Sequence, residues 1–181
     1  MKSSLISRLV ILALLASLNV SADFDKGVAA SQEGRYEMAF QESKEAAEQG
    51  HASAQFKLGN MYRVGEGVTQ DEEEALNWNR LAAEQGYAPA QFNLGLMYRY
   101  GDGVPQDDKE AVKWYRLAAE QGASEAQHNL GFMYRYGKGV PKDDKEAVKW
   151  YQLAAEQGIV EAQFNSGVMY ANGEGVPEDI I

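Results

Sequence analysis

The sequence contains no cysteine, only four prolines and only two histidines among 181 residues. Without cysteine, the chain has no disulfide framework, thiolate nucleophile, cysteine-bound zinc or lipid attached to an N-terminal cysteine. Positive charge is also scarce, because 17 Lys and Arg stand against 27 Asp and Glu and give a formal charge of −10. Affinity for nucleic acid comes largely from Lys and Arg that displace counterions from phosphates, so we expect no nucleic-acid partner.

Long apolar runs are missing as well, except at the N-terminus. Met1–Arg8 carries two positive charges, Leu9–Leu18 is apolar, and small residues lead to Ala22 before the acidic Asp23. These are the parts of a secretory signal peptide, and they predict export with cleavage after residue 22. The apolar run is about half as long as the roughly 20 residues that span a membrane, so we expect no stable membrane insertion.

What the sequence has in abundance is repetition. The pentapeptide Ala-Ala-Glu-Gln-Gly occurs four times, and so does an Ala-Gln pair followed four residues later by Gly. Every interval between copies is 36 residues, which is typical of a repeat architecture. The pentapeptides begin at 46, 82, 118 and 154, and the Ala-Gln pairs begin at 54, 90, 126 and 162.

Each copy predicts two helices, A and B. In the second copy apolar residues recur at helical spacing over 90–98, and Gly101 suits the left-handed position that ends a helix. After a Gly-x-Gly-Val loop, Asp107 can cap helix B over about 107–121, and Glu110 stands at the reciprocal capping-box position. A glycine inside helix A costs about 1 kcal/mol relative to alanine. We therefore expect a neighbouring helix to pass close to Gly59, Gly95, Gly131 and Gly167.

These units resemble the Sel1-like repeat, a relative of the tetratricopeptide repeat with a longer inter-helix loop. The resemblance rests on 90–98, 101–107 and 111–122 and covers about 36–181. It implies an all-α, right-handed superhelical solenoid whose A helices line a concave surface that binds a protein or peptide, and it implies a bacterium, in which the signal peptide would direct the protein to the periplasm or medium. It also implies no catalytic apparatus and no cofactor. The predicted segments are a signal peptide (1–22), an N-terminal capping hairpin (23–51) with a short first helix at 24–34, three full repeats (52–87, 88–123, 124–159) and an incomplete fourth (160–181).

Comparison of the copies separates the predicted core from the predicted surface. Positions that do not vary are assigned to the core between the helices: Leu58, Leu94 and Leu130; Met61, Met97, Met133 and Met169; Tyr62, Tyr98, Tyr134 and Tyr170. The concave face of the tetratricopeptide fold, mapped onto helix A, gives the predicted partner-binding residues. They are Phe56, Asn60, Arg63 and Val64; Phe92, Leu96, Arg99 and Tyr100; His128, Phe132, Arg135 and Tyr136; and Phe164, Val168, Ala171 and Asn172.

Two rows stand out on this face. An aromatic row runs through Phe56, Phe92, His128 and Phe164, and a cationic row runs through Arg63, Arg99 and Arg135. Guanidinium groups offer paired donors to carboxylates, so the rows predict a groove for a peptide with acidic and apolar residues. The alternative is that each arginine pairs with an acidic residue of its own loop and only solubilises the helix end.

The C-terminal segment supports a different function. Residues 160–171 predict a complete helix A, and the chain stops where helix B should begin. Its apolar face is exposed unless something covers it, which predicts dimerisation through residues 160–181 or docking of a partner helix. A frayed chain end is the third interpretation.

Groups for catalysis are few. His51 and His128 belong to no metal motif. The Gly-x-Gly loops lack the preceding strand of a dinucleotide site and are predicted to be turns, and Asp107 and Asp143 are better explained as helix caps than as calcium ligands. Cysteine-rich secreted members of the Sel1-like group are associated with penicillin binding and beta-lactamase activity, but this chain lacks their cysteines and a Ser-x-x-Lys motif. We therefore expect no enzyme, metal or cofactor.

Overall fold

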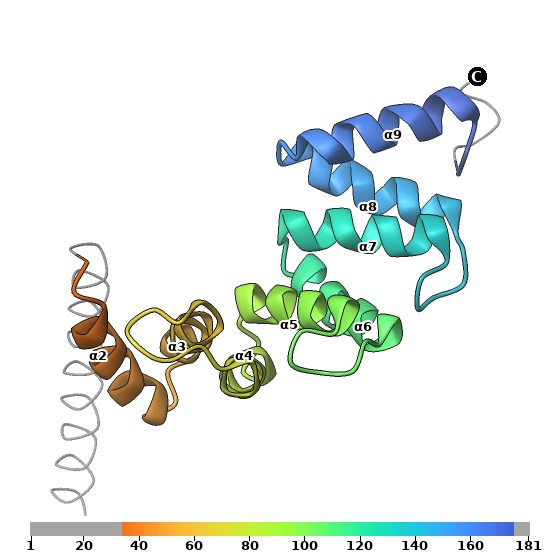
Figure 1. The fold of residues 1–181 in the computed structure, drawn as a ribbon. Coiled ribbons are helices and arrows are strands. Elements are labelled where there is room, and N and C mark those ends of the chain that lie inside the picture. The colour runs from red at the N-terminus through yellow and green to blue at the C-terminus, as the bar shows by residue number, and fades with distance from the viewer. Residues whose placement is uncertain (1–33, 176–181) are drawn as a thin grey trace, which may run out of the picture. The chain divides into compact units, whose positions relative to one another are not determined.

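A computed structural model of the protein describes residues 34–175. These residues form eight helices of 13 residues each and no strand, which confirms the all-α fold class (Figure 1). The predicted signal peptide and nearly all of the short first helix predicted at 24–34 lie outside the described residues. The helices are α2 (Tyr36–Glu48), α3 (Ala52–Val64), α4 (Glu72–Glu84), α5 (Ala88–Tyr100), α6 (Asp108–Glu120), α7 (Ser124–Tyr136), α8 (Asp144–Glu156) and α9 (Val160–Asn172).

Helices of type A and type B alternate as the repeat predicts. From α3 onward the odd-numbered helices are of type A and the even-numbered ones of type B. The helix B predicted at about 107–121 is α6, with Asp107 and Gln121 as its capping residues. Each A helix ends at a glycine in the left-handed conformation, as expected for Gly101, where φ is 79°.

The caps of the B helices are only half of the predicted capping box. The Asp107 side chain accepts from the backbone N–H groups of Lys109 at 2.9 Å and Glu110 at 3.1 Å. The reciprocal contact is missing, because the Asp107 N–H donates to the carbonyl of Tyr98 at 2.8 Å. The Glu110 carboxylate pairs with Lys113 instead. The prediction for Glu110 was therefore wrong, since the backbone of the preceding helix takes the donor that the box would use.

The described residues divide into two compact units, 34–78 and 79–175, with the boundary inside α4. In the first unit α2 packs against α3. Phe40 is buried there and meets the ring of Tyr62 edge-on, with 5.4 Å between ring centroids. Leu58 and Met61, two of the predicted core residues, complete this cluster.

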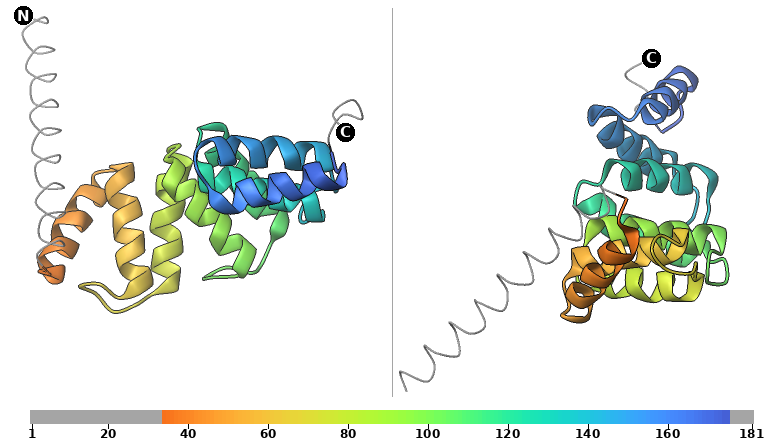
Figure 2. Two further views of the ribbon diagram at one scale, coloured as in Figure 1. Left: turned by 90° about the horizontal axis from the view of Figure 1, so that it is seen from above. Right: turned by 60° about the vertical axis from the view of Figure 1, so that its left-hand side comes forward.

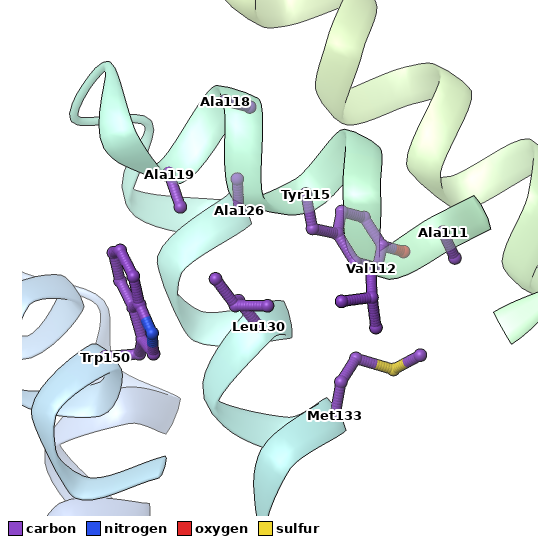
Figure 3. Packing of buried hydrophobic residues seen from close by; sticks show 9 residues of the cluster. All are labelled: Ala111, Val112, Tyr115, Ala118, Ala119, Ala126, Leu130, Met133 and Trp150. Atoms are coloured by element: carbon purple, nitrogen blue, oxygen red, sulfur yellow. The ribbon is translucent and has the colours of Figure 1, made fainter. Parts of the chain in front are cut away.

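In the second unit each helix from α5 to α9 packs against the next, and α7, α8 and α9 lie side by side (Figures 1 and 2). The largest cluster joins α6 and α7 and receives Trp150 from α8 (Figure 3). Trp150 lies beside Ala119, Ala126 and Leu130 in that view. Small side chains such as Ala119 of the repeated pentapeptide thus leave space that is filled by a large ring from α8, the B helix of the next repeat.

The repeated Ala-Gln pair has a direct structural explanation. The Gln91 amide donates to the carbonyl of Ala83 at 3.1 Å, and Gln127 donates to Ala119 at the same distance. Both carbonyls belong to the last turn of a B helix, where carbonyl groups lack partners within the helix. Each glutamine, near the start of an A helix, therefore caps a carbonyl group at the C-terminal end of the preceding B helix.

Two glycines inside the A helices, Gly95 and Gly131, show the expected close approach of the following B helix. A Cβ atom at Gly95 would lie 2.6 Å from the ring of Tyr115, and one at Gly131 would lie 2.9 Å from the ring of Tyr151. A Cβ atom at Gly167 would meet nothing within 4 Å. The prediction is confirmed at Gly95 and Gly131, where the close neighbour is a tyrosine ring of the next helix. It is wrong at Gly167, because no described residue lies over that glycine.

The Gly-x-Gly loops are turns, as predicted, and they sit tightly on the preceding repeat. A Cβ atom at Gly139 would lie 2.2 Å from the carbonyl oxygen of Asp108, and one at Gly175 would lie 2.1 Å from that of Asp144. Only glycine allows the backbone to come this close. Each loop is thereby fixed against the first turn of a B helix.

Candidate partner-binding surface

The residues assigned to the core divide into two groups. Leucines and methionines such as Leu94 and Met133 are buried, which confirms their assignment. The four tyrosines of the A helices are only partly buried, and the hydroxyl of Tyr134 accepts from Arg116 at 2.7 Å. The fully buried tyrosines are Tyr115 and Tyr151 of the B helices, which the sequence comparison missed. Their signal was their recurrence 36 residues apart, each 20 residues after a helix glycine.

The predicted aromatic row is mostly part of the packing. Phe92 is half-buried, with its ring centroid 5.9 Å from that of Tyr115, and His128 lies 5.5 Å from Tyr151 in the same way. Burial lowers the pKa of His128, and the Arg99 guanidinium adds to the effect while Glu161 opposes it. Phe164 is different, because 71% of it is exposed.

Two exposed tyrosine rings in the second unit each stand one residue after an arginine. Tyr100 is 62% exposed and Tyr136 is 54% exposed, and they occupy the same position in consecutive repeats. The Arg99 guanidinium lies over the ring of Phe132, 4.4 Å from its centroid, and 5.4 Å from the centroid of Tyr100. We call the group Arg99, Tyr100, Phe132, Arg135 and Tyr136, from α5 and α7, the Arg–Tyr patch.

The arginines of the predicted cationic row have different surroundings. Arg135 pairs with Glu174, with 3.4 Å between Nη2 and Oε2, and its guanidinium also lies 5.5 Å from the centroid of Tyr136. Glu174 belongs to the next loop along the chain, so the alternative of pairing within the arginine's own loop does not hold for Arg135. No ion pair joins Arg99 to any residue that the structure describes. Arg63 is exposed in the first unit.

The other predicted partner-binding residues lie on α3, α5, α7 and α9. Leu96 and Phe132 pack partly against the cluster between α6 and α7, and Val168 of α9 is half-buried. The residues predicted on α3, namely Phe56, Asn60, Arg63 and Val64, belong to the first unit. The structure thus brings together the predicted residues of α5 and α7 as one patch, and their assignment to partner binding stays a prediction.

Other kinds of site were sought in the same residues. Within 34–175, no cluster of three or more His, Asp and Glu side chains is placed to hold a metal ion. None of the described helices is long and apolar enough to cross a membrane. A cavity of about 520 Å³ lies at the start of α2, lined by residues that include Tyr36, Met38 and Gly67, and it contains none of the predicted residues.

The repeat of the sequence matches a known family. The Sel1 repeat matches four times, at residues 52–87, 88–122, 124–159 and 160–181. Among solved structures, a Sel1 repeat protein from Oxalobacter formigenes is 40% identical, with a TM-score of 0.82. That match covers 90% of this chain and 68% of the other. A protective antigen present in uropathogenic Escherichia coli strains, which has an SLR fold, is 50% identical, with a TM-score of 0.74 over 76% of this chain and 29% of that one.

A curated relative shares a shorter segment. The exopolysaccharide production negative regulator of Rhizobium leguminosarum bv. viciae is 44% identical over 52 residues, which are 29% of this chain and 20% of that protein. The chain therefore spans about a fifth of this relative's length and less than a third of the antigen's. The four Sel1 repeat matches together cover most of the sequence, and the alternating helices of the structure agree with them. The chain therefore belongs to the Sel1 repeat family.

Proposed function

We propose that the protein is an exported, non-catalytic scaffold that binds a protein or peptide segment on the surface formed by α5, α7 and α9. Sel1 repeats generally mediate protein–protein interaction. The observation that supports this surface is the Arg–Tyr patch, where Tyr100 and Tyr136 are more than half exposed beside stacked arginines. Tyrosine and arginine are enriched among the residues that carry most of the binding energy at interfaces.

The patch also rests on a rigid support. Tyr100 and Tyr136 are the last residues of α5 and α7, and each helix ends at a glycine cap and packs against the following B helix. A tyrosine ring on a fixed backbone loses little conformational freedom when a partner covers it. Its apolar face and its hydroxyl can then contribute packing and a hydrogen bond to the same partner.

A site-specific cross-link tests this proposal. We would introduce p-benzoylphenylalanine at Tyr136, or at Leu117 on α6 as a control, because Leu117 is 44% exposed on a B helix. After irradiation in cell-envelope and secreted fractions, we expect a discrete adduct from position 136 and none from position 117. No adduct at 136, or equal labelling at both positions, would argue against binding on this surface.

Self-association is a second candidate function, and the exposure of α9 favours it. Val160 is 69% exposed and Phe164 is 71% exposed, and no described residue lies where a tyrosine ring would cover Gly167. This function predicts a concentration-dependent dimer in light scattering that a Phe164→Ser variant loses. A monomer at all concentrations, or a dimer that Phe164→Ser leaves intact, would remove this candidate.

Export and the enzymatic alternative have simple tests. If the signal peptide is cleaved as we propose, N-terminal sequencing of protein recovered from the envelope or medium gives Asp23 as the first residue. Hydrolysis of a chromogenic beta-lactam by the purified protein, lost on substitution of a single residue, would replace the scaffold proposal with the enzymatic one.

A further inference from the structure

Lys138 breaks a charge pattern in the loops that follow the A helices. The middle residue of the Gly-x-Gly sequence is acidic in the other three copies and basic only in this one. The four residues are Glu66, Asp102, Lys138 and Glu174. A reversal of charge at one copy of a repeated position changes what that copy can bind.

The loops that carry Lys138 and Glu174 pack in the same way against the backbone of a preceding B helix. The second glycine of each loop lies against the first residue of a B helix, where a Cβ atom would come within 2.2 Å of the Asp108 carbonyl at Gly139 and 2.1 Å of the Asp144 carbonyl at Gly175. Because the two loops are fixed in the same way, Lys138 takes the place beside α5 that Glu174 takes beside α7.

Beside α7, that place is next to an arginine. Glu174 accepts from Arg135 at 3.4 Å and from the Asn172 amide at 3.1 Å, so both of its carboxylate oxygens are engaged. The arginine at the matching position of α5 is Arg99. The two positions that hold an ion pair in the next repeat, Arg135 and Glu174, are therefore both occupied by cations here, Arg99 and Lys138.

Nothing in the described residues compensates the charge of Arg99. It makes no ion pair there, and its guanidinium lies over the ring of Phe132, 4.4 Å from the centroid. Its charge reaches the neighbouring side chains, since it helps burial to lower the pKa of His128 and partly offsets the burial that raises the pKa of Tyr115 to about 12. The result is a local positive site on a chain whose formal charge is −10.

We infer that Arg99 and Lys138 bind the carboxylate of one aspartate or glutamate side chain in the partner, with its apolar neighbours against Phe132 and Tyr136. Arg135 does not take part, because Glu174 already neutralises it. A single carboxylate fits better than an acidic run, since the net negative charge of the chain repels a polyacidic segment. This inference rests on the proposed function, whose partner it describes.

The experiment exchanges the charges of the two loops. A phage-displayed library of random peptides is selected on the purified protein, and the enriched peptides are tested by fluorescence anisotropy on K138E, E174K and a Tyr100→Ser/Tyr136→Ser variant. K138E restores the acidic residue that the other loops carry and lets Arg99 pair as Arg135 does, so we expect it to fold normally. Thermal unfolding of each variant checks this.

We expect the library to yield peptides with one acidic residue among apolar ones. Their affinity should fall about tenfold on K138E, the ratio for one lost charge-assisted hydrogen bond, and the serine variant should lose them. E174K leaves Arg99 and Lys138 in place, so it should bind these peptides at least as tightly as the wild type does, and a loss of affinity on E174K would count against the inference. Peptides that need the tyrosines but bind K138E equally well would overturn this inference and leave the proposed function standing. An unenriched library, or peptides indifferent to the tyrosines, would overturn both.

Discussion

At the scale of single residues, identical glycines have opposite energetic consequences. Gly131 lies under the ring of Tyr151, whereas Gly167, at the same position of the next A helix, faces open space. Alanine is the better helix former by about 1 kcal/mol, so only the surroundings can make glycine the favourable residue. The tyrosine rings supply those surroundings at two of the helix glycines, Gly95 and Gly131.

Alanine substitution should therefore act in opposite directions at the two sites. Gly131→Ala forces the ring of Tyr151 or the helix to move, and we expect a loss of about 1–3 kcal/mol in the free energy of unfolding. Gly167→Ala should instead raise it by about 0.5–1 kcal/mol. Equilibrium urea unfolding of both variants measures this, and a similar effect at both positions would contradict the packing explanation.

The half-buried His128 makes stability depend on pH. Burial lowers its pKa from the ordinary value of 6.5 and Arg99 adds to the shift, whereas Glu161 and a hydrogen bond that the ring donates to Asn129 oppose it. The unfolded chain therefore binds a proton before the folded chain does. The contribution of His128 is complete above pH of about 6.5 and is lost as the pH falls toward its lower folded-state pKa.

The matched control is His128→Phe, because the other three copies carry phenylalanine at this position. We expect the unfolding free energy of the wild type, relative to this variant, to decline between about pH 7 and pH 5. Urea unfolding of both proteins at each pH gives that difference, in which the other titrating groups cancel. A difference that does not change with pH would show that His128 has the same pKa in both states.

Sequence reasoning reached some of these residues and not others, for physical reasons. The cost of glycine in a helix predicts a close neighbour at Gly131, but the period does not say which side chain that neighbour is, and Tyr151 went unnoticed. The pairing of Arg135 was sought in its own loop, whereas Glu174 lies 39 residues further along the chain. Contacts across one full repeat depend on how hairpins stack, which local patterns do not reveal.

At the scale of elements, the start of each B helix depends on one aspartate. Asp107 and Asp143 each accept from two backbone N–H groups of the first turn. The helix start was predictable, because an aspartate followed by a run of helix formers is a local signal. The missing second half of the capping box was not predictable, because the competing acceptor on Tyr98 comes from the preceding A helix.

Two substitutions at the start of α6 separate the two halves of the box. Asp107→Ala removes the acceptor for Lys109 and Glu110, and we expect it to cost about 1 kcal/mol of unfolding free energy. Glu110→Gln should cost only about 0.3 kcal/mol, since it weakens an exposed pair with Lys113 and no cap. Urea unfolding compares them, and equal losses would mean that Glu110 also caps the helix in solution.

At the scale of the whole molecule, the stability of a repeat protein is close to a sum of repeat and interface contributions. In the second unit α7 packs against both α6 and α8, whereas α9 packs against α8. Among the residues that the structure describes, no helix covers the face of α9 that carries Gly167. Val160 and Phe164, each about 70% exposed, lie on the same helix.

A chain extended by one helix B should cover that face of α9. Asp179 stands 36 residues after Asp143 in the sequence, so a copy of residues 144–158 in place of Ile180 and Ile181 continues the repeat in register. The copied tyrosine then lies over Gly167 as Tyr151 lies over Gly131. We expect the extension to raise the unfolding free energy, because it buries apolar surface that α9 exposes.

The extension should also reverse the effect of Gly167→Ala. In the present chain Gly167→Ala stabilises α9, because alanine has the higher helix propensity. In the extended chain the added methyl group would clash with the copied tyrosine ring, as in Gly131→Ala, and the substitution would be destabilising. The coupling between the two changes should be about 2 kcal/mol or more in a double-mutant cycle, measured by urea unfolding of the four proteins. If Gly167→Ala stabilises both lengths of chain equally, the added helix does not dock as the repeat predicts. A change of sign would show that a B helix docked after α9 requires a glycine at position 167, as α8 requires one at position 131.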